Sequence, residues 1–396
     1  MEHPVEHVGA RIRYWRKRRS GMSQAVLADL AGVSQSFISH VEAGRKSIER
    51  RSTLVAIARA LQVTVADLLG QPGDPTDPLK ADVAAAAPAI RATLIEIEEG
   101  ERRTPLQEPA ELAAAIAHVA DLRIRSDYAA MAPLLPSLLP EAAAAGFIPL
   151  AQVAYQTSAC LRRFGYRDLA LSAARIAVKA ASQAENPAWL GAARFAHVLT
   201  LPVEVAATTG RLADRTVAQL QANAADPAVR QVLGQLHMSA SFAHAVCGQE
   251  DDAQAHLLAA EHEAETLGDP TDGLGFNHMG FGPTNVGLWR MAVAVEAGEY
   301  GQAIELSKRV DPGPLRVVDR HQSYWLDLGR ALAHSGKTDR EALVAFIHAE
   351  RIAPVPFSVN PLVRDSLVAM VHRARRRAVP HDLRILARRV GIEVPA

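Results

Sequence analysis

The segment from Ser23 to Gly44, SQAVLADLAGVSQSFISHVEAG, most constrains what this chain can fold into. Its apolar spacing predicts two short helices, at about 24–31 and 35–43, joined by a tight turn. Ser23 and Ser34 precede these helices as N-caps, whose hydroxyls accept from otherwise unpaired backbone N–H groups. Gly32 follows the first helix, where the chain needs a positive φ to leave it. The segment therefore predicts a helix-turn-helix unit.

The second of these helices presents polar side chains suited to DNA. In a helix-turn-helix, the second helix enters the major groove with its N-terminal residues foremost. The residues expected to read bases are Gln35, Ser36, Ser39 and His40. The residues expected on the DNA backbone are Gln24, Arg45, Lys46, Arg50 and Arg51. The alternative is an ordinary helical hairpin with polar residues on its solvent side.

Residues 8–70 resemble the DNA-binding domain of the XRE/Cro family of bacterial and phage repressors. The resemblance rests on Ser23-Gln24, Leu27-Ala28, Ala31-Gly32-Val33-Ser34, Ile38-Ser39, Glu42, Gly44, Ala60-Leu61-Gln62-Val63 and Asp67-Leu68-Leu69. It implies a five-helix, lambda-repressor-like domain, although it covers under a fifth of the chain. Ser20-Gly21 makes the approach to the motif one residue longer than usual. The buried Arg–Glu pair of the family therefore falls on Arg16 and Glu42 if the extra residue lies in the loop, and on Lys17 and Glu42 otherwise.

Charge is divided unevenly between the two ends of this chain of 396 residues. Residues 1–70 carry eleven Lys and Arg against six Asp and Glu, while the remainder carries 32 against 37. A basic head on an acidic body suits a DNA reader joined to a part that does not touch DNA. Cys160 and Cys247 have no disulfide or zinc spacing, and no apolar run approaches eighteen residues. We therefore expect a cytoplasmic protein with no membrane partner.

A proline-rich segment marks the clearest boundary. Residues 71–78, QPGDPTDP, hold three prolines and a glycine, which exclude a helix. We therefore expect three parts: a helix-turn-helix domain at 1–70, a linker and connector helix at 71–107, and a helical body at 108–396. The connector helix, interrupted or restarted at Pro88, either passes a change of shape from body to head or is simply the first packing helix.

The body shows a weak internal repeat, in which an apolar helix ends at a glycine and the next helix starts with small residues. The glycines are Gly165, Gly210, Gly248, Gly298 and Gly336, and GEYGQAIELSKRV at 298–310 is the best single match. The body thus resembles a tetratricopeptide-like α-solenoid, so the predicted fold class is all-α. Stacked helical pairs form a superhelix whose concave face is usually lined by first helices. Those helices are expected at about 149–163, 188–207, 229–246, 284–297 and 316–334.

One segment of the body, GLGFNHMGFGPTNVGLWR at 273–290, breaks this helical pattern. Its glycines before Asn285 exclude a regular helix, and aromatic residues sit among them. We expect a loop that covers a small molecule or peptide at the mouth of the solenoid. The residues expected at this effector are Phe276, Phe281, Asn285, Trp289, His321 and Tyr324. The alternative is an insertion that merely packs on a neighbouring hairpin.

The sequence therefore predicts a homodimeric transcriptional regulator that binds double-stranded DNA at a pseudo-palindromic operator and responds to an effector. The alternatives are a regulator whose repeat domain only dimerises or recruits a protein, and a non-regulatory scaffold. The fifteen histidines show no zinc motif and Gly-x-Ser-x-Gly is absent. We accordingly expect no catalytic residue, no metal and no cofactor.

Overall fold

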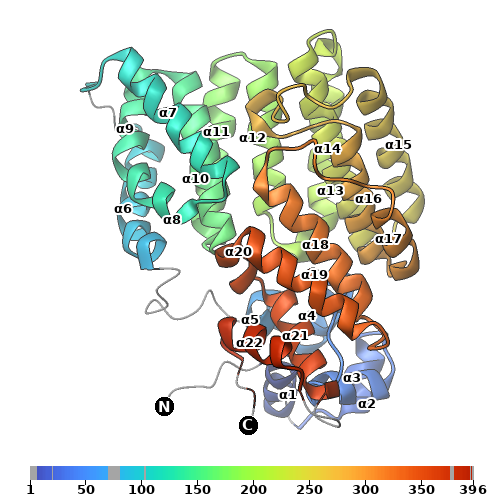
Figure 1. Ribbon diagram of the computed structural model, residues 1–396. Helices are drawn as coiled ribbons and strands as arrows, with labels where there is room; N and C mark the ends of the chain where they lie inside the picture. The colour runs from blue at the N-terminus through green and yellow to red at the C-terminus, as the bar shows by residue number, and fades with distance from the viewer. Residues whose placement is uncertain are drawn as a thin grey trace.

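The computed structural model describes residues 7–19, 21–69, 81–101, 104–374, 379–392 and 394. Within these ranges every regular element is a helix, which confirms the predicted all-α class. A small head lies beneath a larger body of paired helices (Figure 1). The predicted linker at 71–78 lies outside the described residues.

The head contains the five helices expected from the sequence. They are α1 (Val8–Arg18), α2 (Gln24–Leu30), α3 (Gln35–Glu42), α4 (Arg51–Leu61) and α5 (Val65–Leu69). Their apolar faces meet in one core, in which Ile12, Leu27, Ile38 and Ile57 are fully buried. Arg19 closes the end of α4, because its guanidinium donates to the carbonyls of Leu61 and Gln62 at 2.8 Å each.

The body begins with helices that pack on one another before the repeats start. They are α6 (Ala81–Glu98), α7 (Pro109–Ile124), α8 (Tyr128–Met131), η1 (Ala132–Leu134) and α9 (Leu135–Ala145). The connector helix α6 runs through Pro88 without a break, and Pro88 lies on its exposed side. Val83, Ile90 and Leu94 of α6 are buried in the largest core of the body. Helix α6 therefore packs as part of the body.

Five helical hairpins follow, and their first helices lie close to where the repeat predicts them. The pairs are α10 (Phe147–Arg163) with α11 (Arg167–Gln183), α12 (Pro187–Thr200) with α13 (Ala206–Leu220), α14 (Pro227–Val246) with α15 (Glu250–Leu267), α16 (Pro283–Ala297) with α17 (Tyr300–Ser307), and α18 (Val318–Ala333) with α19 (Asp339–Ile352). Short segments η2 (Val203–Val205), η3 (Gln221–Asn223) and η4 (Phe276–His278) lie between them. The chain ends with α20 (Pro354–Ser358), α21 (Pro361–Ala374) and α22 (His381–Arg389). This arrangement is consistent with a helical-repeat solenoid.

One of the five repeat glycines does not have the predicted role. Gly165, Gly248, Gly298 and Gly336 adopt positive φ between consecutive helices, as expected. Gly210 instead lies inside α13, so the assignment of a helix end there is wrong. Gly210 packs against the ring of His244, and a Cβ atom at position 210 would lie only 3.1 Å from that ring.

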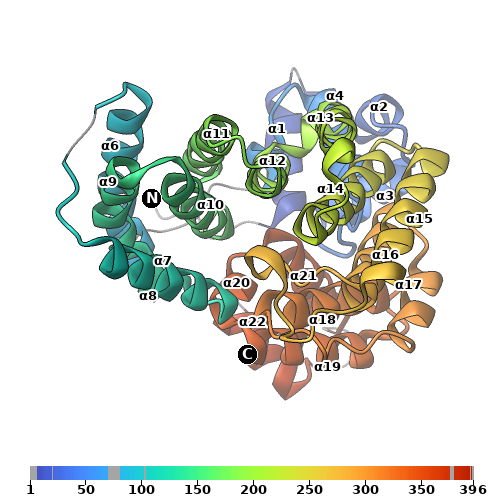
Figure 2. The ribbon, with the colours of Figure 1, turned by 90° about the horizontal axis from the view of Figure 1, so that it is seen from above.

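The row of hairpins curves until its end returns to its beginning, as the view from above shows (Figure 2). Asp319 of α18 makes the closing contact. Its carboxylate accepts a hydrogen bond of 2.7 Å from the Tyr128 hydroxyl, and also contacts Ser126 and Arg163. Burial alone would raise the pKa of Asp319, but Arg163 and these donors hold it below its usual value. The closing carboxylate is therefore a charged, fully partnered group.

No single helix among the described residues is both long and apolar enough to cross a membrane. The segments Pro187–Thr200 and Val203–Asn223 meet the same requirement only as a pair, with a bend of 113° between them. Both pack within the second helical hairpin of the body.

Among the described residues, backbone N–H groups of the head donate to carboxylates of the body at three points. The N–H of Ile48 donates to Asp365 of α21 at 2.8 Å, and the N–H of Val65 donates to Glu204 of η2 at 2.7 Å. The third point, at Arg51, belongs to the site below. Leu362 of α21 extends the apolar core of the head. These contacts fix the orientation of the head on the body.

The Asp365 contact predicts a pH dependence of stability. Burial raises the pKa of Asp365 to about 7, against the opposing effect of the Ile48 hydrogen bond. The folded state thus holds a proton that the unfolded chain releases at a lower pH. Stability from this group is present at acid pH and is lost as pH rises from about 4 to about 7, by at most about 1.4 kcal/mol per unit.

Asp365→Asn removes the titration while its amide oxygen still accepts from Ile48. We expect the free energy of unfolding of the variant, relative to the parent, to increase between pH 5 and pH 7 and then to level off. Urea unfolding at pH 5, 6, 7 and 8 measures this difference. Asp168→Asn, at an exposed position on α11, controls for loss of one negative charge. A difference that is the same at pH 5 and pH 8 contradicts the prediction.

Candidate nucleic-acid interface and body cavity

The helix-turn-helix forms as its capping residues predict. The Ser23 hydroxyl accepts from the N–H of Val26 and the Ser34 hydroxyl from the N–H of Phe37, both at 3.1 Å. Gly32 has φ of 64°, which lets the chain leave α2 and enter the turn. The predicted N-caps of both motif helices are therefore confirmed.

A buried ion pair fixes the recognition helix α3 against α1. The Arg16 guanidinium donates to both carboxylate oxygens of Glu42, at 2.6 and 2.8 Å, and their side chains are 11 and 3% exposed. The partner of Glu42 is thus Arg16, and Lys17 is exposed. The extra residue near Ser20 is accordingly absorbed in the loop.

A chain of hydrogen bonds runs from this ion pair to the start of α3. Gln24 donates to Glu42 at 2.8 Å, and Gln35 donates to the Gln24 side-chain oxygen at 3.1 Å. Gln24, expected on the DNA backbone, thereby holds the amide of Gln35 before any DNA is bound. Such pre-ordering lowers the entropy that a base contact must overcome.

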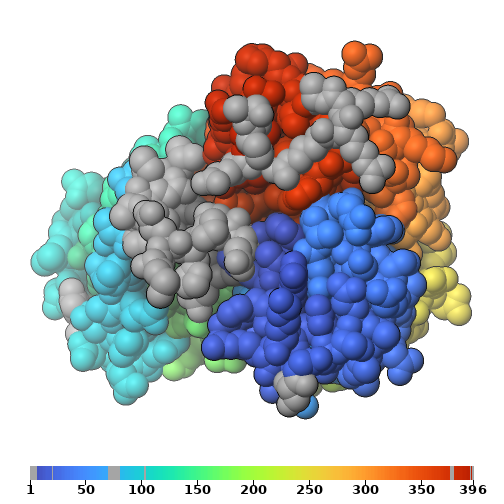
Figure 3. Space-filling model, turned by 90° about the horizontal axis from the view of Figure 1, so that it is seen from below, coloured from blue at the N-terminus to red at the C-terminus, as the bar shows by residue number. Residues whose placement is uncertain are grey.

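The predicted base-reading residues lie on one open face. Gln35, Ser36 and His40 are exposed and Ser39 is half-buried, although the head is docked on the body. From below, the head and the C-terminal segment lie side by side on one face of the molecule (Figure 3). Docking of the head therefore leaves the N-terminal half of α3 accessible.

The four basic residues that follow α3 separate into two pairs. Arg45 is exposed. The ammonium of Lys46 lies 5.2 Å from the centre of the ring of Phe37, which belongs to α3. Arg50 and Arg51 instead contact Glu296 at the end of α16. The N–H of Arg51 donates to the Glu296 carboxylate at 2.9 Å, its guanidinium contacts the same group, and Arg50 donates to the Glu296 carbonyl at 2.9 Å.

This differs from the expectation that Arg50 and Arg51 lie on DNA. The physical reason is that the carboxylate of Glu296, 245 residues from Arg51 in the sequence, lies at the start of α4. Helix α4 begins at Arg51, and its N-cap residue is Arg50. It has no side-chain cap of its own, and the orphan N–H of Arg51 is satisfied by Glu296.

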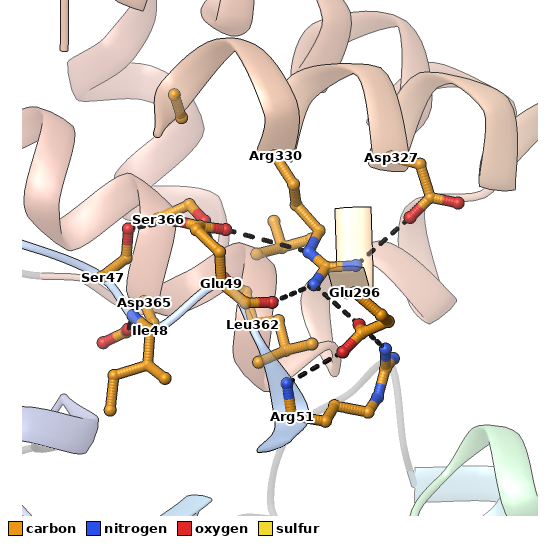
Figure 4. Close-up of polar contacts among 12 residues, drawn as sticks. Ser47, Ile48, Glu49, Arg51, Glu296, Asp327, Arg330, Leu362, Asp365 and Ser366 are labelled. Atoms are coloured by element: carbon orange, nitrogen blue, oxygen red, sulfur yellow. Dashed lines mark hydrogen bonds and ion pairs between the residues drawn. The ribbon is translucent and has the colours of Figure 1, made fainter. Parts of the chain in front are cut away.

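Glu296 and Arg330 form the centre of this contact (Figure 4). Arg330 of α18 lies 3.1 Å from Glu296, 3.2 Å from Asp327 and 3.9 Å from Glu49, and it also donates to the Glu49 carbonyl. Glu296 is fully buried. Burial opposes its charge, but Arg51 and Arg330 hold the pKa of Glu296 below its usual value. Burial raises the pKa of Glu49, with Glu296 adding to the effect, and Arg330 opposes the rise without reversing it.

The glycine-rich segment folds back into the concave side of the body rather than projecting from it. Phe281 is 1% exposed and lies against Gly234 of α14, which has no side chain to occupy that space. Asn285 is fully buried and donates to the carbonyl of Met279 at 3.3 Å. Phe281 and Asn285 thus pack within the body, as in the alternative of an insertion that packs on a neighbouring hairpin.

The other residues predicted at an effector also have partners within the protein. Phe276 packs edge-on against Trp189 with ring centres 5.3 Å apart, and Trp289 packs edge-on against Phe242 at 6.0 Å. His321 contacts the carbonyl of Leu315 at 2.5 Å, and the Tyr324 hydroxyl donates to Ser307 at 2.9 Å. The six residues thus do not form one cavity.

A cavity of about 830 Å³ lies beside them, between α7, α10, α12 and the glycine-rich segment. Its apolar lining includes Leu112, Ile116 and Trp189, and its polar lining includes Gln152, Gln156, Asn277 and His278. This volume is that of a pocket for a small organic molecule.

Asn277 and His278 have unusual backbones and unused polar atoms. Their φ angles are 46° and 50°, a region that costs non-glycine residues about 1–3 kcal/mol. The Asn277 carbonyl accepts from Arg123 at 2.7 Å, yet Asn277 Nδ2 and His278 Nδ1 are buried without a hydrogen-bond partner. Sequence reasoning named the segment but missed these two residues. The Asn-His pair between glycines was the available signal, since Asn and His tolerate positive φ better than most residues.

Comparison with known proteins agrees with this geometry at the head. Residues 7–69 match a family model described as a helix-turn-helix domain. No curated protein and no solved structure matches the chain. The matched domain supports a DNA-binding regulator, with the exposed face of α3 as its candidate contact with DNA.

Proposed function

We propose that this protein is a sequence-specific, non-enzymatic transcriptional regulator of the XRE/Cro type that acts in the cytoplasm. One observation carries the proposal. Gln35, Ser36 and His40 are exposed on a pre-ordered α3 while the rest of the head is fixed to the body. Gln35 and its neighbours read bases in the major groove, and Arg45 and Lys46 contact phosphates.

The base-reading assignment is tested by two substitutions with different expected effects. Gln35→Ala should weaken binding to the cognate site by about 1–3 kcal/mol and relax specificity at one base pair. Lys46→Ala should weaken all sequences alike and reduce the salt slope by about one. Binding to a randomised operator library at several salt concentrations measures both effects. Unchanged site preference in Gln35→Ala shows that the base readers lie elsewhere.

We also propose that the regulator is a homodimer on a pseudo-palindromic operator. One head contacts only one half-site, which supplies too little specific affinity at cellular salt. Val26 and Leu30 project from α2 with 49 and 59% of their surfaces exposed, and are available to a second copy.

The dimer should place two heads on half-sites about 10 bp apart, or a multiple of that distance. Light scattering of the free protein and of its operator complex measures the number of chains. We expect two chains per operator, and a single chain in both samples excludes the dimer.

A small molecule or peptide in the cavity at Trp189 and His278 is proposed to modulate DNA binding. The strained, unpartnered Asn277 and His278 beside an apolar wall provide the polar and apolar parts that such a site needs. The alternative is a repeat domain that only dimerises or recruits a protein partner. By linkage, an effector that changes operator affinity has its own affinity changed equally by the operator.

Trp189→Ala separates these alternatives. Operator binding is titrated with and without low-molecular-weight fractions of cell extract, using the parent, Trp189→Ala and Leu258→Ala as an exposed apolar control on α15. We expect a fraction that shifts operator affinity in the parent and control, with roughly tenfold less potency in Trp189→Ala because a large aromatic contact is lost. The absence of any response in the parent supports the alternative.

A further inference from the structure

A cluster of side chains with metal-ligand chemistry lies on the second and third hairpins, outside the lining of the cavity. Asp214 lies on α13, His244 on α14 and His256 on α15, and one ligand atom from each falls within 4.8 Å of the others. His256 Nε2 is 3.1 Å and His244 Nε2 is 3.6 Å from the Asp214 carboxylate oxygens. Two atoms bound to a tetrahedral ion at about 2.1 Å lie about 3.4 Å apart, so the spacing fits a shared metal.

Two of these atoms lack the hydrogen bonds that burial demands. His244 is 9% exposed, and its Nε2 atom is buried without a hydrogen-bond partner. The Oδ1 atom of Asp214 is likewise buried without a hydrogen-bond partner, and His256 Nε2 lies 3.1 Å from it. Buried polar atoms are nearly always satisfied in native proteins, so two unsatisfied atoms within one cluster indicate a missing ligand.

Neighbouring residues orient both imidazoles toward the carboxylate. Nδ1 of His244 lies 3.1 Å from the side-chain oxygen of Gln249, and Nδ1 of His256 lies 2.9 Å from Nδ1 of His237. In each ring the far nitrogen is therefore held by a second group, which leaves Nε2 directed at Asp214. Metal-binding histidines are commonly fixed in this way by a hydrogen bond from the other nitrogen.

Gly210 explains how the His244 ring comes so close to α13. It lies one turn before Asp214 on the same face, and a Cβ atom there would be 3.2 Å from His244 Nε2. A glycine inside a helix costs about 0.5–1 kcal/mol relative to alanine. Here it leaves the ring and the carboxylate room to converge.

We propose that Asp214, His244 and His256 bind one divalent transition-metal ion, of which zinc is the best fit. Two imidazole nitrogens and one carboxylate oxygen favour such an ion over magnesium or calcium, which prefer oxygen ligands. The Asp214 side chain is 38% exposed, so solvent reaches the cluster and can supply a fourth ligand. The bound ion ties three helices together, and this site does not depend on the proposed DNA-binding function.

The test is zinc binding by tag-free protein stripped with a chelator. Zinc is titrated against a chromophoric competitor with the parent, Asp214→Asn and His256→Ala, and with His262→Ala as an exposed histidine control on the same helix. We expect one tight equivalent in the parent and control. Affinity should fall at least tenfold in both ligand variants, because each removes a direct ligand.

Circular dichroism and cobalt absorption provide two further measurements on the same variants. Asp214→Asn preserves shape, so it decides the outcome if circular dichroism shows that His256→Ala is unfolded. Cobalt bound to the parent should give the visible absorption of a low-coordinate site, which Asp214→Asn should weaken. Parent protein that binds no stoichiometric zinc, or a folded Asp214→Asn variant with the affinity of the parent, overturns the proposal.

Discussion

Backbone amides of the head are satisfied by carboxylates of the body, and the orientation of the helix-turn-helix on the body depends on this. Glu296, Asp365 and Glu204 accept from the N–H groups of Arg51, Ile48 and Val65 respectively. The first amides of a helix have no partner within it, and a body carboxylate at the start of α4 and of α5 supplies one. Glu296 makes the most extensive of these three contacts. Its partner Arg330, on α18, also contacts Asp327 and Glu49.

This contact connects DNA reading to the remainder of the molecule. Arg330 belongs to α18, and Asp319 at the start of the same helix closes the curved body onto Tyr128 and Arg163. One helix thus contacts both the head and the far end of the superhelix. A change in the body that moves α18 must either carry the head with it or break a buried ion-pair network, which is costly because an uncompensated charge is left behind. The cavity borders α7 and α10, and α10 ends at Arg163 of that closing contact.

Local signals in the sequence were enough to predict the fold of the head. In the body they predicted the order of the hairpins and little else. Ser23, Ser34 and Gly32 act within a few residues of themselves, so their caps and turn were predictable. Gly210 was misassigned, since its reason for being glycine is His244 on another helix. The same limit applies to Arg50, Arg51 and Phe281, whose partners Glu296 and Gly234 are distant in sequence. Asp214, His244 and His256 have no motif spacing because they meet only when three helices pack.

In the docked head, Glu296 and a DNA phosphate would compete for Arg50 and Arg51. Both lie in the loop after α3, where phosphate contacts are common, yet both face Glu296. If a phosphate drew Arg51 away, fully buried Glu296 would lose a cation and Arg330 alone would face it. That loss opposes the gain from an exposed, salt-screened phosphate contact. The docked head therefore leaves Arg50 and Arg51 to hold the helix-turn-helix in place, while Arg45 is exposed after α3.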